Sequence, residues 1–474
     1  MLISLAWKNL WRKKSRTFVL IAAISVGLSG GIFSIAITEG LLKQRNIEEI
    51  NQNYSHIQIH SIGFDKNQRL KDTIQNPKTV ENTLKQTPEI NNFTSRLKFM
   101  SILSTAHHTR AALIFGIDPS AENKVTIIHK CLIDSTHKFI ENHDNSIVIS
   151  SLMAQNIGLV NYNVDSSIIQ MLTKRKVDKR LIWQVSQLLG SHFNNRKSFR
   201  DSLKVKLDAD LFENYDDFIM NNCMDYKIGR KIIIRFTDIQ GNIVEEAFKL
   251  TGVYKTNNAM FDNMNVFVHK AYLASLLGVS PYSSSEIAII LNNIDDVDRI
   301  EQTLSQQNPQ QSVKSYKKLD PLILVKGYYL NIYYFVLLGF ILFALSFGII
   351  NTVLMSVVER TKELGMLMAI GMNKKRILGL IVFESTIVTL IGGVLGMILG
   401  AIIAMFFNKN GIDFGYFAES MRTFSMPSII YPVLETKLFV ATTILVILTG
   451  IASSLYPAFR ALKLKPSEAI RTDA

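Results

Sequence analysis

The sequence predicts a membrane protein with four transmembrane α-helices and a large α+β extracytoplasmic domain inserted between the first and second helices. Two observations predict this class. Four apolar segments reach the length of about 20 residues that a bilayer requires, and a long stretch with mixed strand and helix patterns separates the first two. The chain of 474 residues is 48% hydrophobic yet 19% charged, which fits a membrane anchor joined to a water-exposed domain better than a uniform bundle of spans.

The four apolar segments are residues 17–38, 327–358, 377–407 and 438–459. Three of them carry no charged residue, and the third carries only Glu384, close to its start. The first segment is longer than the apolar part of a typical signal peptide and has no clear small-x-small cleavage site after it. We therefore expect it to remain as an anchor.

Lys and Arg flank these segments unevenly, and such residues concentrate on the cytoplasmic side of a membrane. They lie before the first span, between the second and third, and after the fourth: Lys8, Arg12, Lys13, Lys14, Arg16; Arg360, Lys362, Lys374, Lys375, Arg376; Arg460, Lys463, Lys465 and Arg471. Both termini are then cytoplasmic, whereas residues 39–326 and the loop 408–437 are outside. This placement also explains the net charge of +13 without nucleic-acid binding.

The two ends of the chain are expected to lie at the inner membrane surface. Residues 1–16 have apolar residues at helical spacing, with Trp7 and Trp11 one turn apart among basic residues. This pattern is typical of an amphipathic helix that lies in the headgroup region. Residues 460–474 form a basic cytoplasmic tail.

The external domain, residues 39–326, mixes strand and helix signals without a long repeat, which indicates an α+β fold. Residues 56–60 alternate strictly, and residues 232–236 and 246–253 flank a polar, glycine-containing turn, as in a hairpin. Residues 160–226 are rich in Lys, Asp and Asn with apolar residues at helical spacing, and predict a helical insert. The insert is either a lineage-specific addition or a docking element for a partner or substrate.

The cysteines, the histidines and the glycines each add one expectation. Cys131 and Cys223 both lie in the external domain, where they form either a disulfide or two free thiols. The histidines show no metal-ligand spacing, so no metal site is expected. A glycine stripe in the third span, where residues recur every fourth position, predicts a helix-packing face: Gly392, Gly396 and Gly400.

The segment most informative about function is residues 351–371, NTVLMSVVERTKELGMLMAIG, where an apolar span runs into a short, charged, amphipathic segment. Such a segment either turns the chain or presents a rigid lever to a cytoplasmic partner. Its wording, with YPAFRALKLKPSEAIR at residues 456–471, resembles ABC transporter permeases of the FtsX/MacB/LolC–LolE superfamily. The stretches GIDP (116–119), KIGRKIIIRF (227–236) and TGVYKT (251–256) resemble the external domain of MacB-like and lipoprotein-releasing permeases. The insert at residues 160–226 departs from that pattern.

The resemblance implies a permease subunit that works as a homo- or heterodimer with a second permease subunit in the bacterial inner membrane. The cytoplasmic segment 359–376 would contact a separate ATPase subunit, through Glu359, Arg360, Lys362, Glu363, Leu364, Gly365, Met366, Met368 and Gly371. ATP and Mg would be bound by that partner, because this chain has no G-x-x-x-x-G-K-[ST] phosphate loop. We therefore expect a non-enzymatic subunit without its own cofactor.

The separate permease, the size of the external domain and the HIQIH and GIDP wording are most similar to lipoprotein-releasing permeases. This similarity implies extraction of lipoproteins from the membrane, with membrane lipid and a periplasmic carrier as further partners. The acyl chains would lie between the first two spans, against Leu28, Ile32, Ile35, Tyr333, Val336 and Phe340. Two rivals remain: an efflux or mechanotransmission permease acting on a periplasmic partner, and a membrane-anchored extracytoplasmic binding module.

Overall fold

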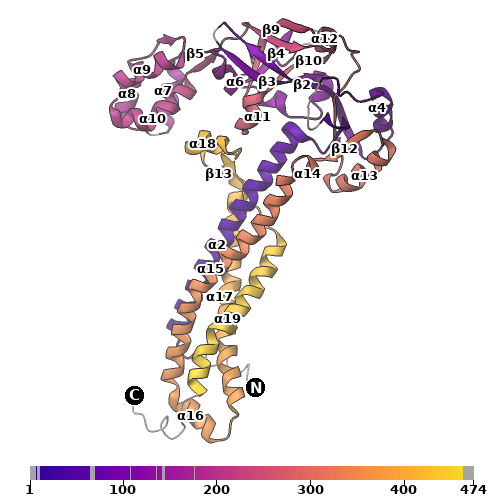
Figure 1. The fold of residues 1–474 in the computed structure, drawn as a ribbon. Coiled ribbons are helices and arrows are strands. Elements are labelled where there is room, and N and C mark those ends of the chain that lie inside the picture. The colour runs from indigo at the N-terminus through magenta and orange to yellow at the C-terminus, as the bar shows by residue number, and fades with distance from the viewer. Residues whose placement is uncertain are drawn as a thin grey trace. The chain divides into compact units, whose positions relative to one another are not determined.

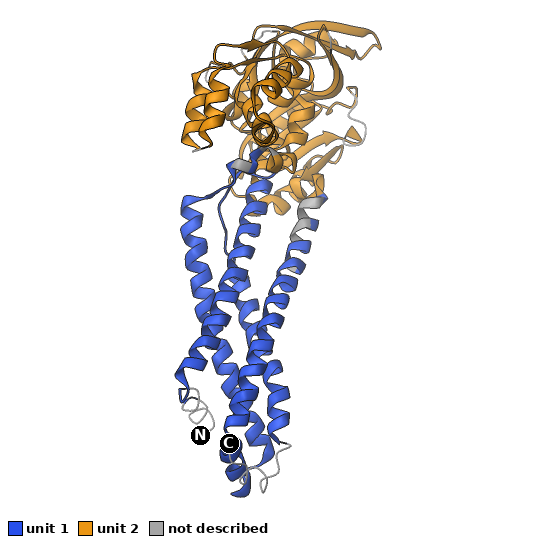
Figure 2. Cartoon of the chain, turned by 90° about the vertical axis from the view of Figure 1, so that its left-hand side faces the viewer, with its two compact units in different colours: residues 1–46, 321–418, 426–474 blue, residues 47–320, 419–425 orange. Residues whose placement is uncertain are grey.

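The computed structural model describes residue 7 and residues 11–64, 70–106, 108–134, 136–140, 145–175 and 177–462. The chain divides into two compact units (Figure 2). Unit 1 comprises residues 1–46, 321–418 and 426–474, and unit 2 comprises residues 47–320 and 419–425. Most of the predicted N-terminal amphipathic helix and most of the tail lie outside the described residues; Trp7 and Trp11 are described, with ring centroids 5.9 Å apart.

Four long helices form unit 1 (Figure 1): α2 (Lys14–Glu49), α15 (Pro321–Glu359), α17 (Lys374–Asn410) and α19 (Thr436–Leu462). By length and composition each could cross a membrane, so the prediction of four apolar helices is confirmed. Each helix overruns its predicted span at both ends, and α2 continues into a π-helical turn at Ile50–Tyr54. Short α16 (Thr361–Ala369) lies between α15 and α17.

The glycine stripe of α17 lets α2 approach its backbone. A Cβ atom added at Gly396 would lie 2.8 Å from the carbonyl oxygen of Ser25 and 2.9 Å from the Cβ of Leu28. A Cβ at Gly400 would lie 2.9 Å from the Cβ of Ile32. Ordinary contacts are wider than this, so only glycine permits the observed spacing. Buried apolar side chains of α2, α15, α17 and α19 fill the rest of this core.

Unit 2 is built on a nine-stranded sheet with the order β12-β1-β11-β2-β3-β10-β4-β9-β8. The strands are β1 (Ile57–Ser61), β2 (Ile90–Ser104), β3 (Thr109–Ile117), β4 (Ser146–Ser150), β8 (Lys231–Thr237), β9 (Ile243–Tyr254), β10 (Asn265–His269), β11 (Glu286–Leu291) and β12 (Gln311–Ser315). An additional β2–β8 pairing closes β2, β3, β10, β4, β9 and β8 into a ring. The predicted hairpin is β8–β9, and β3–β10 and β4–β9 are parallel pairs.

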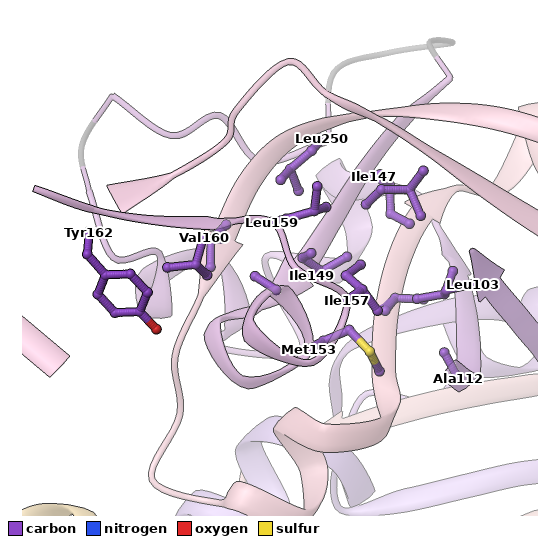
Figure 3. Close-up of a cluster of buried hydrophobic side chains, with 14 of the residues drawn as sticks. Leu103, Ala112, Ile147, Ile149, Met153, Ile157, Leu159, Val160, Tyr162 and Leu250 are labelled. Carbon is purple, nitrogen blue, oxygen red and sulfur yellow. The ribbon is translucent and has the colours of Figure 1, made fainter. Parts of the chain in front are cut away.

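Buried apolar side chains from the strands of this ring pack in one core. Leu103, Ile147 and Leu250 from three strands, with Met153 and Ile157 from around α6, lie in this cluster (Figure 3). The helices that accompany the sheet are α4 (Pro77–Lys85), α5 (Pro119–Glu122), α6 (Ser151–Asn156), α11 (Ala259–Met264), α12 (Lys270–Leu277), α13 (Val297–Gln307) and α14 (Tyr316–Leu319). A second apolar cluster lies between β1, β11, α4 and α13. The predicted α+β content is thus present in unit 2.

A buried cluster of charges marks the point where β2 changes partner. Residues up to Arg96 pair with β11, and residues from Leu97 onward pair with β3. The Arg96 guanidinium donates to both oxygens of Glu122 at 2.9 and 2.7 Å and to Glu286 at 2.5 Å. Lys98 lies 3.2 Å from the second oxygen of Glu286. All four side chains are buried and mutually paired.

The insert at residues 160–226 is not purely helical. It contains α7 (Ser166–Lys174), α8 (Lys179–Ser186), α9 (Arg196–Lys206) and α10 (Ala209–Asn222), but also β5 (Val160–Asn163), β6 (His192–Phe193) and β7 (Met224–Tyr226). Val160 pairs with Tyr226, so the insert leaves and rejoins the domain at one place. Strands of two to four residues are too short for alternation to reveal them, which explains the difference.

The disulfide alternative for Cys131 and Cys223 is wrong in this structure, because both are free thiols. Cys223 is buried in the apolar cluster of the insert, whereas Cys131 packs beside the Phe261–Phe267 cluster. Burial raises the pKa of Cys131 to about 11 and that of Cys223 to about 12, so both remain protonated at neutral pH.

Candidate functional site

Local sequence signals fix the turn from α15 to α17. Helix α16 ends in a Schellman motif, in which the Gly371 N–H donates to Met368 and the Met372 N–H donates to Leu367. Gly371 has a φ of +93°, a conformation that L side chains rarely adopt. Asn373 then caps α17 by accepting a hydrogen bond from the Lys375 N–H at 3.0 Å. The predicted coupling segment is therefore a defined helix–turn–helix element.

One face of α16 is buried and another is exposed. Leu364 and Gly365 are buried, and Leu364 clusters with Val357, Ile377 and Ala458 from α15, α17 and α19. Four residues at helical spacing are exposed instead: Lys362, Met366, Ala369 and Ile370. Ile370 is 83% exposed, and the exposed basic residues Lys374, Lys375 and Arg376 follow it. Of the predicted contact residues, Met368 is only partly exposed.

The charged residues of the predicted coupling segment pair within unit 1. Glu363 pairs with Arg12 and, at 3.2 Å, with Arg360. Glu359 pairs with Lys13 at 2.9 Å and with Arg16 at 3.4 Å. These ion pairs link the basic residues at the start of α2 to the end of α15 and to α16. Both glutamate side chains stay partly exposed, so their contact with a partner remains a prediction. Burial opposes ionisation of Glu363, but hydrogen bonds from Arg12 and Arg360 outweigh it and hold the pKa of Glu363 below its usual range.

Arg360 also reaches α17, where its Nη1 lies 3.1 Å from Glu384. The ion pairs surround a cavity of about 190 Å³ whose apolar lining includes Leu20, Val353 and Leu380. From the sequence alone, these basic residues indicate only a membrane flank. The signal that could have paired them is that Arg12, Lys13, Glu359 and Glu363 all border predicted spans on the same side of the membrane.

The six residues predicted to line one substrate cavity lie in two different environments. Leu28 and Ile32 are fully buried and Ile35 nearly so; α17 glycines contact the first two. Tyr333, Val336 and Phe340 of α15 are exposed. The expectation is corrected for Leu28 and Ile32, because the α17 glycines turn this face of α2 into an internal helix contact. Ile35 instead lines a cavity of about 460 Å³ together with Tyr334 and Phe335 of α15. Among the described residues, no group of three or more His, Cys, Asp or Glu side chains could hold a metal ion.

The part of the chain that contains this turn is similar to known permeases. Residues 335–466, which contain α16, α17, α19 and most of α15, match the family model "FtsX-like permease C-terminal". An uncharacterized ABC transporter permease of Methanocaldococcus jannaschii is 30% identical over 197 residues, 40% of this chain and 50% of that protein. A macrolide export ATP-binding/permease protein MacB of Vibrio parahaemolyticus is 36% identical over 126 residues, 27% of this chain and 17% of that protein.

The matched part of the chain, residues 335–466, is thus similar to an FtsX-like permease domain. Its similarity to the named relatives supports an ABC transporter permease of the FtsX/MacB type. The chain spans half the length or less of these relatives. The match to the periplasmic region of MacB from Actinobacillus actinomycetemcomitans covers 59% of this chain and 98% of that one, at 11% identity and a TM-score of 0.31.

Proposed function

We propose that this chain is the non-catalytic permease subunit of an ABC transporter and that a separate ATPase subunit, which binds ATP and Mg, docks on the exposed face of α16. The observation that carries the proposal is the exposed position of Met366 and Ile370 on a turn whose geometry is fixed at Gly371 and Asn373. Exposed apolar patches rimmed by polar residues mark interaction sites. The distribution of Lys and Arg supports a cytoplasmic position for this turn. The proposal therefore also includes unit 2 outside and the helices in a bacterial inner membrane.

The ion pairs connect the turn to α2 and α17, so a displacement of the docked turn can be transmitted to these helices. A partner shifts a conformational equilibrium only if it binds the two states differently. A displacement of α16 would act directly on α17 through the capped turn. It would also act on the start of α2 through Glu363 and Arg12, and on Glu384 through Arg360. The charged residues therefore serve transmission inside the subunit, and the apolar face serves recognition.

The docking face is tested by Ile370→Glu, with Val205→Glu as its matched control. Ile370 is 83% exposed and Val205 in unit 2 is 82% exposed, so both changes place a carboxylate on an exposed apolar residue. The full chain is purified in detergent from its own cells with MgATP, and co-purifying ATP-binding-cassette subunits are quantified by mass spectrometry. We expect at least a tenfold loss for Ile370→Glu, equivalent to about 1.4 kcal/mol, and none for Val205→Glu. Equal retention in both variants contradicts the docking face.

As substrate we propose lipoproteins, with acyl chains lying against the exposed α15 residues Tyr333, Val336 and Phe340. Two properties of these side chains support the proposal: they are exposed and they are largely apolar. An acyl chain that packs against such a surface gains about 0.8 kcal/mol per buried methylene. The opposing wall would come from a second permease subunit, because Leu28 and Ile32 are already buried within this one. Efflux of a small molecule or action on a periplasmic partner is equally consistent with the MacB-type relatives.

A photo-crosslinker separates these substrates. Placed at Val336, it is expected to capture acylated protein and to lose it when MgATP is added to the ATPase complex. A crosslinker at Val394, exposed on α17, serves as the control for bulk lipid. Capture of phospholipid alone at both positions, without dependence on nucleotide, contradicts the lipoprotein substrate and favours the efflux alternative.

A further inference from the structure

The predicted external loop between the third and fourth spans is an ordered arm. Its base is a pairing of β13 (Ile412–Asp413) with β14 (Ile429–Ile430), extended by a 2.7 Å hydrogen bond from the Phe414 N–H to the Ser428 carbonyl. Its tip contains α18 (Ala418–Thr423), and residues 419–425 belong to unit 2, although both flanking stretches belong to unit 1.

Arg422 anchors the tip in a socket of unit 2. Its Nε donates to the Thr256 carbonyl at 2.9 Å, and its Nη2 pairs with the Asp262 carboxylate and lies 3.3 Å from Ser151 Oγ. Ser151 belongs to α6 and Asp262 to α11, whereas Thr256 lies in the loop between β9 and α11. Arg422 is 6% exposed and Asp262 is fully buried. The planar guanidinium reaches these acceptors from two nitrogen atoms, Nε and Nη2, whereas an ammonium would present its donors from a single atom.

The socket is built to receive a cation. Burial raises the pKa of Asp262, and the charge of Arg422 opposes that shift. The Thr256 hydroxyl and N–H also donate to Asp262, at 2.8 and 3.0 Å, and so hold its carboxylate toward the tip. Without the arginine, a buried carboxylate would face the socket with hydrogen-bond donors but no opposite charge.

A second contact holds the end of the tip. Ser425 Oγ lies 3.1 Å from Asn258 Oδ1, the side chain that caps α11. The Ser425 backbone has a φ of +55°, unusual for a residue with a side chain, and its N–H donates to the Arg422 carbonyl at 2.9 Å. A strained residue persists when its surroundings hold it. The tip is therefore fixed at both Arg422 and Ser425.

We propose that Arg422 is a positioning residue that clasps the arm between α17 and α19 into unit 2, so that displacement of these helices is transmitted to unit 2 through the Arg422–Asp262 pair. The coupling role rests on the proposed permease function; the clasp itself does not. The arm differs from a slack loop in having a paired base and an anchored tip. It can therefore transmit pushing as well as pulling, whereas a flexible tether transmits only pulling, and only when it is taut.

The clasp is tested first in the full chain alone, without an ATPase. Arg422→Ala combined with Asp262→Asn removes the ion pair without leaving a buried charge. We expect the backbone amides of residues 421–425 to exchange hydrogen at least tenfold faster, whereas α6 and α11 stay protected. Arg110→Ala, a change at an exposed arginine of unit 2, is the control and leaves exchange unchanged. Unchanged exchange at the tip in the double variant overturns the clasp.

Coupling is tested next in the ATPase complex. In the double variant we expect the nucleotide-dependent change in hydrogen exchange of unit 2 to fall at least threefold, with the ATPase still bound. Adding Ser425→Cys and Asn258→Cys gives a disulfide that replaces the clasp, verified by mass spectrometry; coupling should return on oxidation and vanish on reduction. Full coupling in the unlocked double variant overturns the transmitting role. Failure of the unchanged chain to retain any ATPase refutes the permease proposal instead, and the first experiment still decides the clasp.

Discussion

Arg96 of unit 2 and Arg12 of unit 1 each pair with a glutamate, but the Arg96 side chain is 1% exposed and the Arg12 side chain is 62% exposed. Around Arg96, two carboxylates and Lys98 are removed from water together. Around Arg12, the pairs with Glu363 and between Lys13 and Glu359 remain partly hydrated. The same chemistry therefore has two different consequences in one chain.

The difference separates permanent from adjustable structure. Removing one member of a buried cluster leaves uncompensated charge, which costs several kcal/mol. An exposed pair contributes about 0–1 kcal/mol and can be replaced by water and counterions. The Arg96 cluster is suited to fix the place where β2 changes partner. The pairs at the α15–α16 end are suited to an element that we propose to move.

The comparison predicts its largest effect for Arg96→Ala, which leaves Glu122 and Glu286 buried without their shared partner. We expect a loss of about 3–5 kcal/mol in the free energy of unfolding of unit 2, measured by thermal and denaturant unfolding of the full chain in detergent. Arg110→Ala should change stability by less than about 0.5 kcal/mol, since Arg110 is exposed. A similar free energy of unfolding for both variants would contradict the special stabilising role of the buried Arg96 cluster.

Acid should weaken the buried cluster next. Burial alone would raise the pKa of Glu286, but the charges of Lys98, Arg96 and His60 outweigh it and lower the pKa to about 2. Because the folded pKa lies below the ordinary value of 4.5, this carboxylate stabilises unit 2 fully above pH 4.5. That stabilisation is lost as the pH falls from 4.5 toward about 2. Unfolding followed over this range should show less pH dependence in a Glu286→Gln variant; an equal slope would contradict the assignment.

A smaller effect is expected where unit 1 depends on close packing rather than on charge. Gly396→Ala places a Cβ 2.8 Å from the Ser25 carbonyl oxygen, so we expect destabilisation of about 1–3 kcal/mol. Gly348→Ala in α15 is the matched control, because nothing lies within 4 Å of its added Cβ and alanine favours helix. Thermal unfolding of unit 1 in micelles distinguishes them, and equal melting temperatures would show that α2 can move away from α17 without cost.

The smallest effect should come from the exposed pairs. A double-mutant cycle of Arg12→Ala and Glu363→Ala is expected to give a coupling energy below about 1 kcal/mol. Raising the salt concentration to 1 M shortens the screening length to about 3 Å and should abolish that coupling. The same salt should leave the Arg96 cluster unaffected. A coupling of several kcal/mol that resists salt would make the two clusters alike.

The sequence predicts local features of this protein well. The four apolar helices follow from length and the absence of charge, and the β8–β9 hairpin follows from the polar residues of its turn. Gly371 and Asn373 are local signals for a helix end and a helix start, so the α16–α17 turn was within reach of sequence reasoning. These features depend on neighbours in the chain, which is why pattern alone suffices.

Contacts between distant residues were not predictable in the same way. Arg422 and Asp262 are 160 positions apart and Arg96 and Glu286 are 190 apart, and no pattern in one sequence pairs them. The sequence also did not show which face of α2 packs against the other helices, and the reason is different. Lipid and helix core are both apolar, so Leu28 and Ile32 could equally face either, and only the α17 glycines decide between them. The charges of Glu359 and Glu363 were visible, but the direction in which they point was not.

The closed ring of unit 2 also limits how a partner chain could join the sheet. Closure gives each strand of the ring a neighbour on both sides, which removes the unpaired edges that favour strand addition. The other branch of the sheet runs from β2 through β11 and β1 to β12. Among the described strands of this nine-stranded sheet, β12 is the one with a single neighbour. An extended peptide that lengthened this sheet would therefore pair along Gln311–Ser315, a template of only five residues.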